Sequence, residues 1–316
     1  MKKNHRLYAI PLLALALAAC TNDGLQDDPL ADGPVALSVT ADISTVATRA
    51  QSTVFDNGDP IGIFPYTSTT EMEAAQANKL YTYSGSAFTS TAPYYFQDRD
   101  TKYFHAYYPF NASLTAESHT ITIDTRATNQ TTETLEGTSI SWRKNDYLFA
   151  SAQTSVSTPS VAYTGNNAFN HVMSQLVFTF LAGTNDGIAN LQALTGYKID
   201  TPLTMDGTFD AAAGTVTLGS SGKESLEMGI TGASGTSIEC TPLILLPQSV
   251  TGGTIKLVVT YNNVEYTANL TLPTSELKPG NSYTYTVTIK NTGLEVSQAT
   301  ISNWTTTSAT GDATLQ

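Results

Sequence analysis

The sequence predicts an all-β protein made of β-sandwiches, and three observations support this fold class. Apolar and polar residues alternate with period two in many short segments, which is typical of strands that bury one face. Turn-forming residues recur about every ten residues, a spacing that favours antiparallel sandwiches over alternating strands and helices. Only 13% of the residues are charged, while Thr, Ser, Gly and Tyr are abundant, as in extracellular β proteins.

The N-terminus has the features of a lipoprotein precursor. Basic residues precede the apolar segment 7–18, as in a secretory signal peptide. This segment ends in Leu-Ala-Ala-Cys, which resembles a bacterial lipobox and implies that Cys20 becomes the acylated first residue. We therefore expect residues 1–19 to be a signal peptide. An ordinary secretory signal with a chance cysteine is the alternative.

Residues 20–49 are expected to form a tether and an N-terminal strand. The part from 21 to 34 is acidic and contains Gly and Pro, so it cannot bury a core. The segment Val35–Ser44 has the clearest alternation in the N-terminal half of the chain. Its apolar positions fall on one face of an extended strand and are Val35, Leu37, Val39, Ala41 and Ile43.

A candidate protease site follows this strand. Arg49 and Ala50 lie among small residues, which makes the bond between them accessible to a trypsin-like protease. A second Thr-Arg-Ala tripeptide occurs at 125–127, so the tripeptide alone is not specific. Position distinguishes the two, because cleavage after Arg49 would release one terminal strand, whereas cleavage after Arg126 would split a domain.

The remaining elements divide the chain into two predicted sandwiches, at 50–166 and 167–305, followed by a tail at 306–316. In the first we expect a turn at Asp56–Asp59, a short helix at 71–80 and an aromatic core strand at 103–110. The polar segment 125–141 is either a long loop or a weak hairpin. The segment 155–167 is rich in Ser, Thr, Pro, Gly and Asn, and we interpret it as the boundary between the two sandwiches.

The second half continues the pattern of strands and turns. Apolar alternation begins at 169–183 and recurs in several later segments, among them 253–272 and 281–290. Asn262 and Asn263 separate two strand patterns and predict a two-residue hairpin turn. Cys240 precedes a near-continuous apolar strand and is interpreted as a small buried hydrophobic residue.

No pattern indicates catalysis, a metal or a cofactor. The two cysteines, Cys20 and Cys240, cannot build a disulfide framework, and the four histidines lack metal-ligand spacing. The sequence has no Gly-rich phosphate loop and no Gly-x-Ser-x-Gly, so we do not expect an enzyme. The formal net charge is −12, and the few basic residues are never clustered, which argues against nucleic acid as a partner.

An ordered set of short motifs resembles the fimbrillin-like (Mfa-like) family of Bacteroidales. Together with the lipobox, these motifs are FDNGDPIGIF, YFHAYYPF, FNHVMSQLVFTF, LILLPQ, LKPGNSYTYTVTIK and ISNW. The resemblance implies two transthyretin-like β-sandwiches and a subunit of a type V pilus at the cell surface. It also implies an outer-membrane lipoprotein precursor, anchored through Cys20, whose N-terminal segment is removed by an arginine-specific surface protease.

In that scheme the emptied groove accepts a strand from another pilus subunit. Transferred to this chain, Val35–Ser44 is the expelled strand and Arg49–Ala50 is the cleaved bond. Stalk subunits of the family donate a strand from the C-terminal end, but few apolar side chains follow Trp304 here. Either donation uses Leu294, Val296 and Ile301, or the subunit only accepts a strand, as at a pilus tip.

The role of stalk or tip stays open at this point. A surface lipoprotein that binds glycans in a nutrient-uptake system is the alternative function. That alternative requires exposed aromatic side chains, a retained N-terminal tether and no polymerisation.

Overall fold

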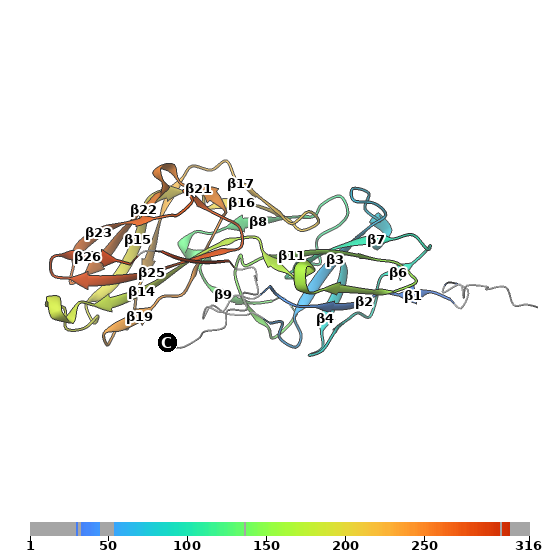
Figure 1. Cartoon of the computed structure of the whole chain (residues 1–316), viewed down its shortest axis with the longest axis horizontal. Helices are drawn as coiled ribbons and strands as arrows, with labels where there is room; N and C mark the ends of the chain where they lie inside the picture. The colour runs from blue at the N-terminus through green and yellow to red at the C-terminus, as the bar shows by residue number, and fades with distance from the viewer. Residues whose placement is uncertain (1–29, 31–32, 45–53, 136, 298, 304–316) are drawn as a thin grey trace, which may run out of the picture.

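Strands make up almost all of the regular structure, and two regions of β-sheet follow one another along the long axis of the molecule (Figure 1). The structure is a computed structural model that describes residues 30, 33–44, 54–135, 137–297 and 299–303. Within these residues the helical elements are short 3-10 turns, namely Ala74–Gln76, Ala127–Asn129, Gly165–Asn167, Thr184–Asp186 and Thr251–Gly253. The predicted all-β fold class is confirmed.

The first region is built on an eight-stranded sheet. Its strands in spatial order are β12 (Ser160–Tyr163), β2 (Ser38–Ala41), β5 (Phe88–Thr89), β4 (Lys79–Tyr83), β3 (Pro60–Tyr66), β7 (Lys102–Tyr108), β11 (Leu148–Thr154) and β13 (Asn170–His171). A short pair, β1 (Val35–Ala36) with β6 (Tyr95–Phe96), lies beside it. The sheet curls on itself, because β12 at one end packs against β11 near the other.

The second region contains a six-stranded and a four-stranded sheet that enclose one apolar core. The six-stranded sheet consists of β19 (Ser237–Glu239), β14 (Ser174–Ala182), β25 (Asn281–Lys290) and β26 (Gly293–Val296), with β20 (Leu243–Leu245) also on β14 and β27 (Thr300–Asn303) also on β25. The four-stranded sheet consists of β18 (Glu224–Gly229), β15 (Leu194–Leu203), β22 (Thr254–Tyr261) and β23 (Val264–Thr271). A short pair joins β21 (Gln248–Ser249) to β24 (Glu276–Leu277).

A third set of strands connects the two regions. In one small sheet, β8 (Thr120–Asp124) pairs with β16 (Asp206–Asp210), which continues into β17 (Thr215–Leu218). The hairpin of β9 (Thr132–Thr134) and β10 (Ser141–Arg143) lies nearby. A separate apolar cluster contains side chains from both halves of the chain. The two regions therefore share main-chain hydrogen bonds as well as a core, and the division at 166 and 167 stays a prediction.

Side chains reinforce this connection at Gln130. Its amide Nε2 donates to the carbonyl oxygens of Thr125 and Ile244, at 2.7 and 2.8 Å, and its Oε1 accepts from the Ile244 N–H at 2.9 Å. The buried glutamine thus takes the place of a peptide unit beside β20. Arg143 also crosses from β10 and donates through Nη2 to the carbonyl oxygen of Pro242.

Three local predictions have definite outcomes. The predicted helix at 71–80 is wrong, because this stretch holds only the 3-10 turn Ala74–Gln76 before β4 begins at Lys79, and Asn78 has a positive φ of 55° that a helix would not allow. The polar segment 125–141 is in part a hairpin. The turn at Asn262–Asn263 is confirmed, with φ angles of 51° and 60° between β22 and β23.

Within the described residues no helix is long and apolar enough to cross a membrane.

Candidate functional site

The N-terminal segment Val35–Ser44 lies in the core of the first region as two short strands, β1 and β2. Alternate side chains face inward, and Leu37, Val39 and Ile43 retain only 3%, 1% and 6% of their exposed area. Val35 and Ala41 are partly buried against the same cluster. Since fully burying an aliphatic side chain contributes about 1.5–3 kcal/mol, the three inner side chains bind this segment strongly to the region.

One edge of the segment is paired from Ser38 to Ser44. It runs parallel to residues 159–169, and the β2–β12 register places Val39 opposite Val161. Main-chain N–H groups of Ser38 and Asp42 donate to the carbonyl oxygens of Pro159 and Tyr163, both at 2.9 Å. Farther along, the segment exchanges two hydrogen bonds with Phe169, which immediately precedes β13. The segment therefore closes the curled sheet by joining its two ends.

The other edge of the segment is held by the β1–β6 pair and by two further contacts. Val39 pairs with Phe88 of β5, and the N–H of Leu37 donates to the carbonyl oxygen of Tyr94 at 2.9 Å. The hydroxyl of Tyr81 accepts from the Tyr94 N–H at 3.0 Å and donates to the Leu37 carbonyl oxygen at 3.4 Å. Burial raises the pKa of Tyr81 to about 12, so this hydroxyl keeps its proton at neutral pH.

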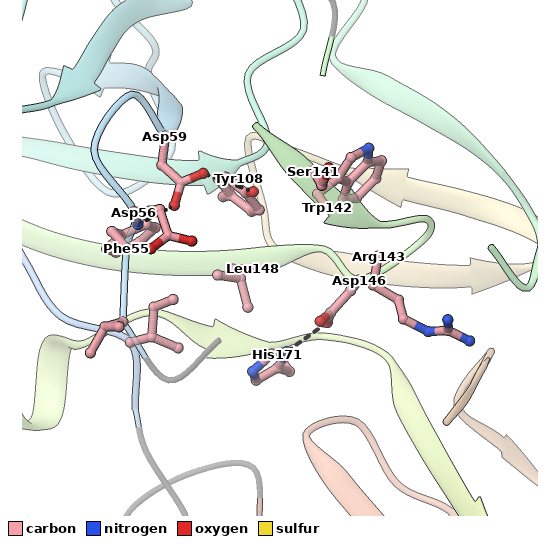
Figure 2. A pocket seen from close by; sticks show the side chains of 12 residues that line it. Phe55, Asp56, Asp59, Tyr108, Ser141, Trp142, Arg143, Asp146, Leu148 and His171 are labelled. Carbon is pink, nitrogen blue, oxygen red and sulfur yellow. Dashed lines mark hydrogen bonds and ion pairs between the residues drawn. The ribbon is translucent and has the colours of Figure 1, made fainter. Parts of the chain in front are cut away.

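The segment ends beside a small cavity of about 40 Å³ (Figure 2). Ile43 and Val54, which are far enough apart in sequence to belong to different segments, both line this cavity. The Nδ1 atom of His171 lies 2.6 Å from Oδ1 of Asp146, and both side chains are largely buried. Asp59 also lines this cavity.

Asp59 is an acceptor for two groups in this cavity. Its carboxylate accepts the Asp56 N–H at 2.7 Å and the Tyr108 hydroxyl at 3.1 Å, as Figure 2 shows for Tyr108. Burial raises the pKa of Asp59, and the hydrogen bond from Asp56 acts in the opposite direction. The Asp59 N–H also closes a turn on the Asp56 carbonyl oxygen at 2.9 Å, which is the turn that the sequence predicts. No three acidic, His or Cys side chains gather into a metal site within the part of the chain that the structure describes.

The acylation and cleavage residues, Cys20, Arg49 and Ala50, lie outside the described residues. The second Thr-Arg-Ala tripeptide is described, and it is folded. Thr125 is fully buried, and the Arg126 carbonyl oxygen accepts the Asn129 N–H at 2.8 Å. The Arg126 guanidinium lies 2.6 Å from the Glu224 carboxylate. This arginine therefore lies at the start of a 3-10 turn, and its side chain forms an ion pair.

The candidate donor residues belong to the second region. Leu294 and Val296 lie on β26 opposite Ile289 and Val287 of β25. Ile301 lies on β27 opposite Tyr283 of the same strand. All three pack against the apolar core of that region. The two edge strands lie end to end along β25, and they would have to leave it before they could pair with another molecule.

The strand that pairs with the N-terminal segment was not predicted from the sequence. Residues 155–167, predicted as a boundary, contain β12, which pairs with β2. The available signal was the alternation at Val161 and Tyr163, which are both buried. This alternation covers only a few positions and lies among turn-forming residues, so it is a weak signal for a strand.

Sequence comparisons with known proteins identify a family and a relative for this chain. A family model described as fimbrillin-like matches residues 48–304. A Bacteroides uniformis protein described as a candidate fimbrium subunit, Fim1C, is 27% identical over 331 residues, covering 96% of both chains.

Two crystal structures of candidate cell adhesion proteins have the same fold. The one from Bacteroides uniformis superimposes with a TM-score of 0.65 at 22% identity, covering 86% of this chain and 99% of the other. The one from Bacteroides ovatus gives 0.66 at 22% identity, with 87% and 99% coverage. Since the family model spans most of the sequence, the chain belongs to the fimbrillin-like family.

Proposed function

We propose that the protein is a type V pilus subunit that is exported as a lipoprotein, matured by an arginine-specific protease and assembled by strand exchange. The relatives described as fimbrium and cell adhesion proteins support the general role. The observation that carries the mechanism is the placement of Val35–Ser44. The inward-facing side chains Leu37, Val39 and Ile43 are deeply buried, and the segment ends shortly before Arg49.

Removal of the segment would leave a defined acceptor groove. The carbonyl oxygens of Pro159, Tyr163 and Tyr94 would lose their N–H donors. The sites now filled by Leu37, Val39 and Ile43 would become empty apolar hollows. An exposed strand edge of this kind pairs readily with another chain. A replacement strand would supply main-chain hydrogen bonds along the edge and one apolar side chain at every second position.

The same geometry specifies the incoming strand. To reproduce the present pairing it must run parallel to 159–169 and carry large apolar side chains at the positions of Leu37, Val39 and Ile43. Leu294, Val296 and Ile301 are the candidate donor residues on this chain. A subunit in which β26 and β27 stay paired with β25 would accept a strand without donating one, and would act at a pilus tip.

The N-terminus of the protein recovered from the cell surface tests the proposal. Peptide sequencing and intact mass are expected to give a start at Ala50, and Arg49→Ala is expected to leave the protein as a monomer with acylated Cys20. Arg126→Ala is the matched control and should be processed normally. A start at Cys20 in the native protein, with no shorter form, would contradict the proposal and favour a surface glycan-binding lipoprotein that does not polymerise.

A further inference from the structure

A second, larger cavity shares Trp142 with the small cavity beside the N-terminal segment. It is an open groove of about 820 Å³ between the β9–β10 hairpin, the strands β3 and β4, and the loop after β7. None of the residues 33–44 line it. Its volume is in the range of sites that bind small molecules, about 300–1,000 Å³. Residues other than those of the segment therefore form the whole described lining of the groove.

Aromatic and apolar side chains form part of the groove wall. Trp142 of β10 lies next to Tyr147, with ring centroids 5.5 Å apart and an angle of 60° between the planes. Tyr108 meets the same indole at 86°. Among the described aromatic residues, none stacks parallel to the Trp142 ring. Phe110 is partly exposed, and Leu80 retains 40% of its exposed area.

Hydrogen-bonding groups lie beside these apolar surfaces. Glu133 of β9 is directly opposite Trp142 in the hairpin, so the carboxylate and the indole project from the same face. The Trp142 N–H, the hydroxyl groups of Thr82 and Thr134 and the amide Nδ2 of Asn111 have no hydrogen-bond partner among the described residues. These groups offer both donors and acceptors to a ligand.

The charge of the groove restricts the ligand class. Of the described residues that line it, only Glu133 is charged, and its carboxylate lies 2.9 Å from the Lys144 ammonium group. No lining Arg, Lys or His is available for a phosphate or a carboxylate. An apolar ligand would leave the unpaired donors without partners, which is unfavourable. A neutral ligand with one apolar face and many hydroxyl groups fits both conditions.

We propose that this groove binds a neutral saccharide. The C–H face of a pyranose ring packs against the Trp142 indole, whose face carries partial negative charge. The hydroxyl groups around the ring then reach Glu133, Thr134, Thr82 and Asn111. The aromatic residue and the carboxylate come from adjacent positions of one hairpin, so their spacing is fixed by the strand register rather than by a loop.

Direct binding to the full chain tests this proposal. The probes are neutral oligosaccharides that end in glucose, galactose, mannose or N-acetylhexosamine, and titration calorimetry measures the dissociation constant. Trp142 and Trp304 are the only tryptophans, so Trp304→Phe leaves Trp142 as the single indole reporter. We expect at least one probe to bind and to change the Trp142 emission with the same dissociation constant.

Two variants and a control locate the site. Thr134→Arg and Leu80→Arg place a long cation in the groove at exposed positions, and each should weaken binding at least tenfold. Val264→Arg, at a position with 50% exposure at the start of β23, should leave binding unchanged. Thermal unfolding midpoints equal to that of the native protein would show that the variants fold.

Three outcomes would overturn the proposal. They are the failure of every probe to bind, binding that both groove variants leave within twofold of native, and displacement of the bound probe by an unrelated extended peptide. The last outcome would identify the groove as a peptide site. None of them depends on processing at Arg49, so failure here is distinct from failure of the strand-exchange mechanism.

Discussion

The main-chain N–H of Leu37 donates to the carbonyl oxygen of Tyr94 at 2.9 Å, at the point where the N-terminal segment passes from the β1–β6 pair into the eight-stranded sheet. Leu37 therefore belongs to neither strand, although its side chain is only 3% exposed. Its position makes it a junction between two sheets, and its buried side chain is one of three that hold the segment in the core.

Leu37→Ala should destabilise the uncleaved protein by about 2–5 kcal/mol, because it removes buried apolar volume and leaves a cavity. Val35→Ala is the control, since Val35 is only partly buried at the edge of the same core, and its cost should be smaller. Urea unfolding of the two variants measures the difference. Equal costs for the two changes would show that the segment is not docked as described.

Gln130→Ala should weaken the connection between the two regions. The change leaves the N–H and C=O of Ile244 without their partner, and each buried unpaired group costs about 1–3 kcal/mol. Gln76→Ala is a close control, because Gln76 makes the same two-bond pairing with the Tyr95 peptide at an exposed position. Amide hydrogen exchange in β20 and β8 should rise in the first variant only. Unchanged exchange in both strands would contradict this role for Gln130.

Gly214 fixes the contact between the β16–β17 turn and the first region. A Cβ atom there would lie 2.3 Å from the Phe149 ring, and φ is +71°. Gly214→Ala should therefore lower the thermal midpoint more than Gly235→Ala, whose φ of +70° is equivalent but whose Cβ would meet no atom within 4 Å. The difference should correspond to about 1–3 kcal/mol of overpacking. Equal shifts of the two midpoints would mean that the turn does not pack on Phe149.

Cys240 should be unreactive in the folded protein. It is 9% exposed, and burial raises the pKa of its thiol to about 12, so at pH 8 roughly one thiol in ten thousand is ionised. The thiol therefore has a higher pKa in the folded protein than in the unfolded protein. Its contribution to the free energy of unfolding is complete at pH values below the unfolded-state pKa, and it is lost as the pH rises towards 12.

The measurement is the rate of disulfide exchange with an aromatic disulfide reagent in a Cys20→Ser background. We expect the rate at pH 8 to follow global unfolding and to increase with added urea. Modification of the native protein at the rate of a free thiol would contradict the buried position of Cys240.

Local patterns predicted much of the strand content, because alternation of apolar residues directly reflects a half-buried strand. Asn262 and Asn263 predicted their hairpin turn for a similar reason, since asparagine tolerates positive φ. The helix expected at 71–80 failed because helix-forming residues there are overruled by the pairing of Lys79–Tyr83 with β3.

Pairing partners could not be predicted in the same way. Val39 and Val161 are far apart in sequence, and a period of two shows which side of a strand is buried but not which strand lies beside it. The cross-connection of β8 with β16 is equally non-local. For the groove, Trp142 and Glu133 come together only through the register of a hairpin that the sequence left undecided.

The paired strands between the two regions also have a mechanical consequence. The N-terminal strands lie at one end of the elongated molecule and β26 at the other (Figure 1). If neighbouring subunits hold these two ends, tension along a filament must pass through the middle of each subunit. There it meets the five residue pairs of β8 and β16 and the bonds of Gln130. Each subunit would therefore transmit load as one stiff unit rather than as two beads on a flexible string.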